Sequence, residues 1–109
     1  MSLRIDLTDR HEHHNEDVKQ YAREKVERLT RYFDKVQHIE VVFDKENSDH
    51  SVEIIVSANH HLRFVGHATH PSVMAAIDRV MEKLEKQVVK AKERMKDHHR
   101  GDSPLHRAS

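Results

Sequence analysis

The chain lacks cysteine and tryptophan, and it has only two glycines and two prolines among its 109 residues. Without cysteine there is no disulfide framework, no thiol nucleophile and no thiolate metal site. Two glycines are too few for a glycine-rich phosphate loop, and no G-x-S-x-G segment is present to carry a catalytic serine. We therefore expect a protein that is not an enzyme and that needs no cofactor.

Long apolar runs are also missing. No segment approaches the roughly 20 apolar residues that a membrane span needs. The opening residues Met1-Ser2-Leu3-Arg4 lack the apolar run of a signal peptide. With 36% hydrophobic and 35% charged residues, the chain can build one modest core in one domain. We expect a soluble, cytoplasmic protein with no membrane partner and no small-molecule substrate.

The formal net charge is zero, which by itself argues against nucleic-acid binding. The distribution of charge matters more than its sum. The first fifty residues carry an acidic excess, the remainder carry a basic excess, and residues 79–100 are mainly basic. A local basic element of this kind can still dock on phosphate groups.

Hydrophobic periodicity predicts the secondary structure. Alternating apolar residues indicate four strands, at 3–7, 36–45, 51–57 and 62–67, and residues 46–49 form a turn cluster. Helical spacing predicts a first helix over 16–33, capped by Asn15. A second helix has Pro71 in its first turn and ends at Gly101.

The element order β-α-β-β-β-α predicts an α+β sandwich, in which one face of a four-stranded sheet carries both helices. We expect residues 1–97 to form this α+β domain. Residues 98–109 are expected to be a flexible polar tail.

The last helix carries two separate stripes on a wheel of 100° per residue. The apolar stripe comprises Val73, Ile77, Val80, Leu84, Val88, Ala91 and Met95. A second arc, roughly 120° away and about 23 Å long, holds five cations that we call the basic stripe: Arg79, Lys83, Lys86, Lys90 and Arg94. Helices that only need solubility usually intermix charges of both signs. The sorting therefore favours contact with an RNA phosphate array.

The first helix adds a smaller basic set. Lys25 and Arg28 flank its apolar stripe, and Arg31 lies one step further round. If the two helices lie side by side on the sheet, these three residues and the basic stripe could border one shared surface.

Two segments resemble a known family. Residues 29–34, L-T-R-Y-F-D, are similar to the L-x-x-Y-F-D stretch of bacterial ribosome hibernation-promoting factors and ribosome-associated inhibitors, the family of the S30AE-type domain. Ala75-Ala76-Ile77-Asp78, followed by Lys83-Leu84, Gln87, Lys90 and Lys92, looks like the family's A-A-I-D-x-x-x-x-K-L-x-x-Q-x-x-K-x-K helix. The resemblance covers about residues 3–97. It departs at Ser72-Val73-Met74, where the family usually has Asp-x-Tyr.

The resemblance implies a domain similar in shape to double-stranded RNA-binding domains. It implies binding to the 30S ribosomal subunit and its 16S rRNA near the decoding centre, which blocks mRNA and tRNA binding under stress. The short length matches the family's short form, which lacks a C-terminal dimerisation domain, so we expect a monomer or weak homodimer. The family's rRNA-contacting positions correspond to Lys25, Arg28, Arg31, Lys83, Lys86 and Lys90, to which the helical wheel adds Arg79 and Arg94.

Other interpretations stay open. The chain could be a generic RNA-binding module, or a protein-interaction module that uses an exposed sheet face around Val42 and Ile55. Adjacent histidines in His11-Glu12-His13-His14 are suitable ligand types but lack the spacing of a specific metal site, so we predict none.

Three further groups have simple interpretations. The acidic residues Asp44, Glu46 and Asp49 are interpreted as a solvated turn cluster. Tyr32 and Phe33 are interpreted as rim and core residues and not as a stacking platform. The twelve histidines suggest that mild acid adds positive charge and strengthens RNA binding.

Overall fold

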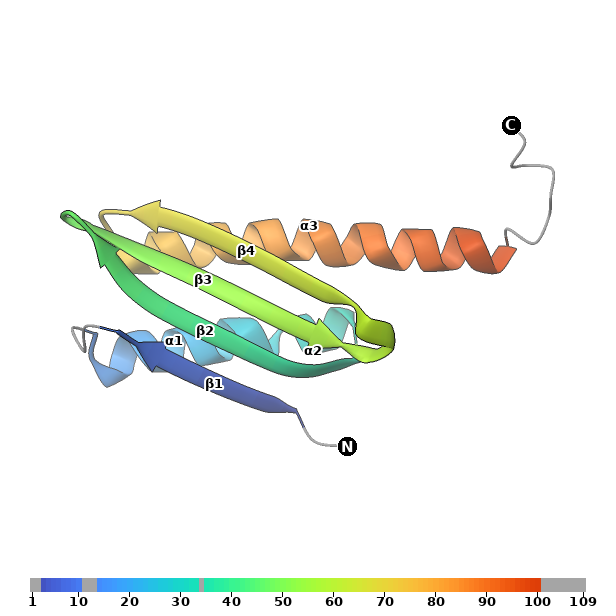
Figure 1. Ribbon diagram of the computed structural model, residues 1–109, viewed down its shortest axis with the longest axis horizontal. Helices are drawn as coiled ribbons and strands as arrows, with labels where there is room; N and C mark the ends of the chain where they lie inside the picture. Colours follow the sequence, from blue (N-terminus) through green and yellow to red (C-terminus); the bar gives the residue numbers. More distant parts are fainter. Residues whose placement is uncertain (1–2, 11–13, 34, 101–109) are drawn as a thin grey trace.

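The structure is a computed structural model, and it describes residues 3–10, 14–33 and 35–100. Its elements follow the predicted order, with an extra helical turn after the first helix and a short 3-10 turn before the last strand (Figure 1). The elements are β1 (Arg4–Asp9), α1 (Glu16–Glu27), α2 (Leu29–Tyr32), β2 (Val36–Glu46), β3 (Asp49–Ala58), η1 (Asn59–His61), β4 (Arg63–His70) and α3 (Val73–Arg100).

The four strands form one mixed sheet in the order β1-β2-β3-β4. β1 runs parallel to β2, because α1 and α2 carry the chain back across the sheet before β2 begins. β2, β3 and β4 are joined as an antiparallel meander. Consequently β1 and β4 are the two edge strands.

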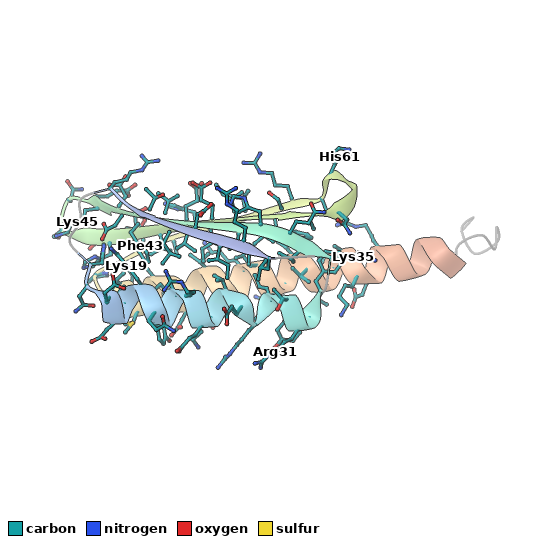
Figure 2. The ribbon with its side chains drawn as sticks, turned by 90° about the horizontal axis from the view of Figure 1, so that it is seen from below. Lys19, Arg31, Lys35, Phe43, Lys45 and His61 are labelled. Atoms are coloured by element: carbon teal, nitrogen blue, oxygen red, sulfur yellow. The ribbon has the colours of Figure 1, made fainter. Side chains whose placement is uncertain are left out.

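The segment formed by α1 and α2 and the long helix α3 cover the same face of the sheet, as predicted (Figure 2). The core lies between these two layers, and its strand residues are alternate positions such as Ile39, Val41 and Phe43 of β2, none of which is exposed. The predicted apolar stripe of α3 supplies the opposite side of this core through fully buried Ile77, Val80, Leu84 and Val88.

The first helix begins as predicted, since the Asn15 side chain accepts a hydrogen bond of 3.0 Å from the Val18 amide. The prediction of one continuous helix over 16–33 is wrong at Arg28, where α1 ends and the short α2 follows. At this break the Thr30 hydroxyl donates a 2.7 Å hydrogen bond to the Glu27 carbonyl, which tightens the turn.

The β2–β3 turn is shorter than predicted. Only Asn47 and Ser48 form it, while Glu46 and Asp49 are paired strand residues. Asn47 has φ 60°, a left-handed conformation that asparagine tolerates better than most residues. The acidic residues of this region therefore belong to strands and not to a turn cluster.

The last strand runs past Gly66 to His70, so its predicted end near residue 67 is too early. Gly66 lies where α3 packs closest: a Cβ atom there would be 3.0 Å from Val80 Cγ1. The missing side chain at Gly66 thus lets the helix pack closely on the middle of the strand.

Pro71 precedes α3 and does not lie in its first turn, because Ser72 provides the cap. The Ser72 carbonyl accepts a hydrogen bond from the Ala76 amide, and its hydroxyl accepts one from the Ala75 amide.

The helix α3 has 28 residues and continues to Arg100. Residues 98–100, predicted as the start of the tail, therefore belong to this helix. Residues 101–109 lie outside the described residues. Within the described part of the chain, no helix is long and apolar enough to cross a membrane.

Candidate nucleic-acid interface

The basic stripe of α3 runs beside the edge strand β4, and one of its members is bonded to that strand. Lys83 Nζ donates a hydrogen bond of 2.6 Å to the backbone carbonyl of His67. One turn later, Gln87 Nε2 donates one of 2.8 Å to the carbonyl of Val65. Both carbonyls lie on the open edge of β4, where no neighbouring strand is present to donate hydrogen bonds to them. The two side chains therefore cover part of an edge that would otherwise expose unpaired backbone groups.

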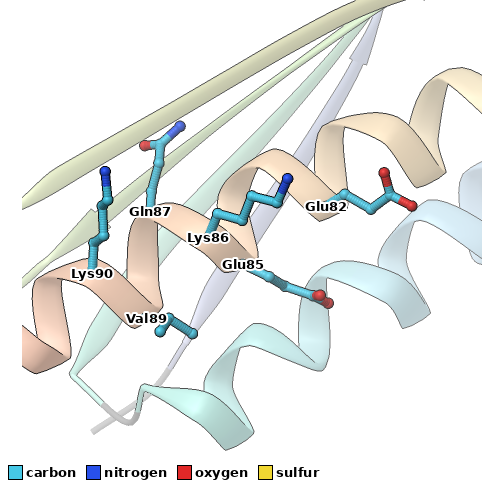
Figure 3. Close-up of a pocket in the computed structure, with 6 residues that line it drawn as sticks. All are labelled: Glu82, Glu85, Lys86, Gln87, Val89 and Lys90. Atoms are coloured by element: carbon cyan, nitrogen blue, oxygen red, sulfur yellow. The ribbon is translucent and has the colours of Figure 1, made fainter.

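The other four residues of the stripe, Arg79, Lys86, Lys90 and Arg94, are exposed. Among the described residues, no acidic side chain forms an ion pair with any of them. Lys86 and Lys90 line a shallow groove on α3 together with Glu82, Glu85, Gln87 and Val89 (Figure 3). In this view Gln87 and Lys90 extend toward the sheet edge. These four cations are the part of the stripe that is available for an anionic partner.

Lys25 of α1 is engaged at the contact between α1 and α3. Its Nζ atom lies 3.8 Å from Asp78 Oδ1 and 5.2 Å from the centre of the Tyr21 ring. The Tyr21 hydroxyl donates a 2.6 Å hydrogen bond to the same Asp78 oxygen. This hydrogen bond, more than partial burial, raises the pKa of Tyr21 above its ordinary value.

The basic stripe of α3 and the cations of the first helical segment do not form one continuous surface. Asp78 faces α1 and Lys83 faces β4, and the two lie about 140° apart around α3. On the same wheel, Glu82, Glu85 and Val89 all lie within about 40° of Asp78. An acidic strip thus lies between the basic stripe and the cations of the first helix, Lys25, Arg28 and Arg31.

Arg28 and Arg31 are exposed, and Arg31 is followed by the adjacent aromatic residues Tyr32 and Phe33. Phe33 is a core residue, as predicted, with 4% of its surface exposed, while Tyr32 is 48% exposed. Helical spacing distinguishes the two aromatic residues as rim and core, but it does not indicate a function for either. The exposed Tyr32 is a functional candidate that periodicity alone did not identify.

The sheet face opposite the helices carries a small apolar spot in polar surroundings. Val42 is 8% exposed, and Ile55 pairs with Val65, which is 41% exposed. On the same face, Asp6 Oδ2 lies 2.9 Å from His38 Nε2 and 3.1 Å from Arg4 Nε. The His38 hydrogen bond is the main reason that the pKa of Asp6 is lowered. The predicted dimer surface at Val42 and Ile55 stays a prediction.

His14 is a buried structural residue. Its side chain is 3% exposed, its Nδ1 lies 3.1 Å from Asp9 Oδ2, and its Nε2 lies 2.9 Å from His50 Nδ1. The ring also packs against Phe43, with 5.0 Å between ring centres. The other residues of the histidine cluster considered as metal ligands, 11–13, lie outside the described residues. Within the described residues, no group of three or more potential ligands could hold a metal ion.

Comparison with known proteins identifies the family. Residues 5–96 match the family described as sigma 54 modulation protein / S30EA ribosomal protein. The chain is 29% identical over 100 residues to a ribosome hibernation promoting factor of Azotobacter vinelandii, covering 92% of this chain and 86% of the relative. A ribosome hibernation promoting factor of Pseudomonas putida is 27% identical over 92 residues, covering 84% of this chain and 89% of the relative.

Solved structures share the fold. A ribosomal subunit interface protein from Coxiella burnetii superposes with a TM-score of 0.77 at 20% identity, covering 84% of this chain and 99% of the other. The N-terminal domain of Protein Y from Thermus thermophilus has a TM-score of 0.68 at 27% identity, covering 76% of this chain and 91% of that domain. With the match over residues 5–96, the chain belongs to the sigma 54 modulation protein / S30EA ribosomal protein family.

Proposed function

We propose that this chain is a non-enzymatic ribosome hibernation factor of the cytoplasm. It docks on 16S rRNA of the 30S subunit near the decoding centre and blocks the binding of mRNA and tRNA under stress. Family membership and the names of the relatives support association with the ribosome. The rRNA site and the blocking mechanism go beyond those names, and they rest on the resemblance of the helix motifs.

The observation that carries the proposal is the row of exposed cations on one flank of α3. Arg79, Lys86, Lys90 and Arg94 are free of acidic partners among the described residues, and they span about 23 Å of helix. A row of this length can meet several successive phosphates of one RNA strand. Each neutralised phosphate releases counterions, so affinity must fall steeply as salt concentration rises.

The eight proposed RNA-binding residues differ in their expected contributions. Lys83 and Lys25 are held by His67 and Asp78, so part of their hydrogen-bonding capacity serves the fold. The four free cations of α3 form the main phosphate contact. Arg28 and Arg31 lie beyond the acidic strip and contact a different part of the RNA.

The experiment is co-sedimentation with purified small and large ribosomal subunits at low and high salt. The test variant changes Lys86, Lys90 and Arg94 to Gln, and the control variant changes Lys19, Lys35 and Lys45 to Gln. Both lose three positive charges, but the control residues lie outside the stripe (Figure 2). The wild type and control should travel with small subunits at low salt, and the test variant should stay at the top of the gradient.

Retained small-subunit binding by the folded test variant would contradict the role of the stripe. Binding to free RNA but not to small subunits would instead favour a generic RNA-binding module. A protein-interaction module is favoured only by the apolar spot at Val42, Ile55 and Val65. That function predicts no salt-dependent sedimentation with either subunit.

A further inference from the structure

Tyr32 stands apart from the other aromatic residues. It is 48% exposed, whereas Phe33, Phe43 and Phe64 are each at most 6% exposed. The remaining aromatic residue, Tyr21, packs against the core and is bonded to Asp78. Within the described residues, Tyr32 therefore presents the one large aromatic surface that is half open to solvent.

The backbone around Tyr32 is fixed on both sides. Leu29 is fully buried and Phe33 nearly so, and the Phe33 amide donates a 2.9 Å hydrogen bond to the Leu29 carbonyl. Lys92 of α3 donates a 2.5 Å hydrogen bond to the carbonyl of Tyr32 itself. The ring is thus presented from an ordered turn, and binding a planar ligand would cost little backbone ordering.

Three cations belong to the same region of the helical layer as Tyr32. Arg31 precedes Tyr32 and extends outward from the helical layer (Figure 2). Arg28 is exposed one turn earlier, and Lys92 reaches the same turn from α3. An exposed aromatic face beside cations is the combination that binds single-stranded nucleic acid, where bases stack and phosphates are neutralised.

We propose that Tyr32 stacks on an unpaired RNA base while Arg28 and Arg31 contact the phosphates of the same strand. This inference rests on the proposed RNA-binding function, and it adds a preference for unpaired nucleotides. Bases of a duplex are stacked on each other and offer no free face inside the helix. The stripe on α3 would contact phosphates of either form, whereas the Tyr32 site selects single strands or loops.

The test measures binding of a labelled oligouridylate and of an RNA duplex with the same number of phosphates. Tyr32→Leu keeps apolar bulk without an aromatic face, and Tyr32→Phe keeps the face without the hydroxyl. Val65→Ala, at another exposed apolar residue, is the matched control. Tyr32→Leu should weaken single-strand binding roughly 5- to 150-fold, as expected for one lost base stack. Tyr32→Phe and Val65→Ala should bind like the wild type.

The salt dependence separates stacking from charge. Tyr32→Leu should leave the slope of log affinity against log salt unchanged, whereas Arg31→Gln should reduce it by about 0.7 for the single strand. Duplex binding should be insensitive to Tyr32→Leu. Equal loss of single-strand and duplex affinity, or no loss of either, would overturn the stacking site and leave the proposed function standing. Failure of the wild type to bind either RNA would overturn both.

Intrinsic fluorescence provides a second readout. The chain has no tryptophan and two tyrosines, so Tyr21→Phe leaves Tyr32 as the only strong emitter. Its emission should be quenched by the oligouridylate and not by the duplex. Saturating binding of the oligouridylate without quenching would contradict stacking, even if the Tyr32→Leu variant were unstable.

Discussion

Lys83 Nζ donates a 2.6 Å hydrogen bond to the backbone carbonyl of His67, and so attaches α3 to the edge of the sheet. Gln87 makes the equivalent contact with Val65. The residues Lys83 and Gln87, which resemble the family's K-L-x-x-Q segment, therefore have a structural use in this chain. A lysine that the charge pattern assigns to RNA binding is at the same time a stabilising contact for the fold.

The first prediction separates these two roles of lysine. Lys83→Met should lower the free energy of unfolding by about 1 kcal/mol, because it removes a hydrogen bond to an edge carbonyl. Lys90→Met should change stability by less than about 0.5 kcal/mol and reduce the salt slope of RNA binding. Urea denaturation and binding titrations at several salt concentrations measure the two effects. The opposite pattern would show that Lys83 is an ordinary surface cation.

The second prediction concerns the close approach of α3 to β4. Gly66→Ala should destabilise the fold by about 1–3 kcal/mol, because the added Cβ would lie 3.0 Å from Val80 Cγ1 and 3.3 Å from the Val80 carbonyl. Combined with Val80→Ala, the loss should be smaller than the sum of the two single losses. Urea unfolding of the four proteins in this cycle measures the coupling. If the losses of stability in the two single variants simply added up, Gly66 and Val80 would not be in contact.

The third prediction is a pH effect at the contact between α1 and α3. The pKa of Tyr21 is raised by its hydrogen bond to Asp78, so the unfolded chain loses this proton first as pH rises. The stabilisation is complete below about pH 10 and is lost as pH rises through the folded-state pKa. The stability difference between wild type and Tyr21→Phe should thus be constant at neutral pH and shrink above about pH 10. A difference independent of pH would refute this account.

The fourth prediction concerns the buried histidine. His14→Ala should destabilise the fold by about 2 kcal/mol, because it removes the contacts to Asp9, His50 and Phe43 together. His38→Ala is the control, since that ring is 36% exposed and bonded to the partly exposed Asp6. His38→Ala should lower the free energy of unfolding by less than half as much as His14→Ala does. Equal losses of stability in the two variants, measured by thermal unfolding, would show that the burial of His14 does not stabilise the fold.

The local features of this fold were predictable from the sequence because each depends on neighbouring residues. Asn15 caps α1 through an amide three residues away, and the buried Ile77, Val80 and Leu84 follow directly from helical spacing. The predicted helix over 16–33 failed where a local side chain, Thr30, competes for the backbone. The use of glycine at position 66 could not be predicted locally, because the packing that favours it comes from a distant helix.

The candidate site was predictable as a pattern of charge but not as a set of contacts. A helical wheel gives the angle of Lys83 around α3, but it does not show that an edge strand lies beside it. Tyr21 and Asp78 are 57 residues apart, and His14 and His50 are 36 apart. Such pairs depend on the order of strands and the placement of helices, which periodicity does not specify.

The most direct test of the central claim is chemical footprinting of 16S rRNA in small subunits that carry the bound chain. The wild type and the Lys19, Lys35 and Lys45 control should protect the same nucleotides, clustered at the decoding centre. The variant that replaces Lys86, Lys90 and Arg94 should lose this protection while it keeps its fold. Protection elsewhere on the subunit, or the same protection by all three proteins, would contradict the docking of α3 at that site.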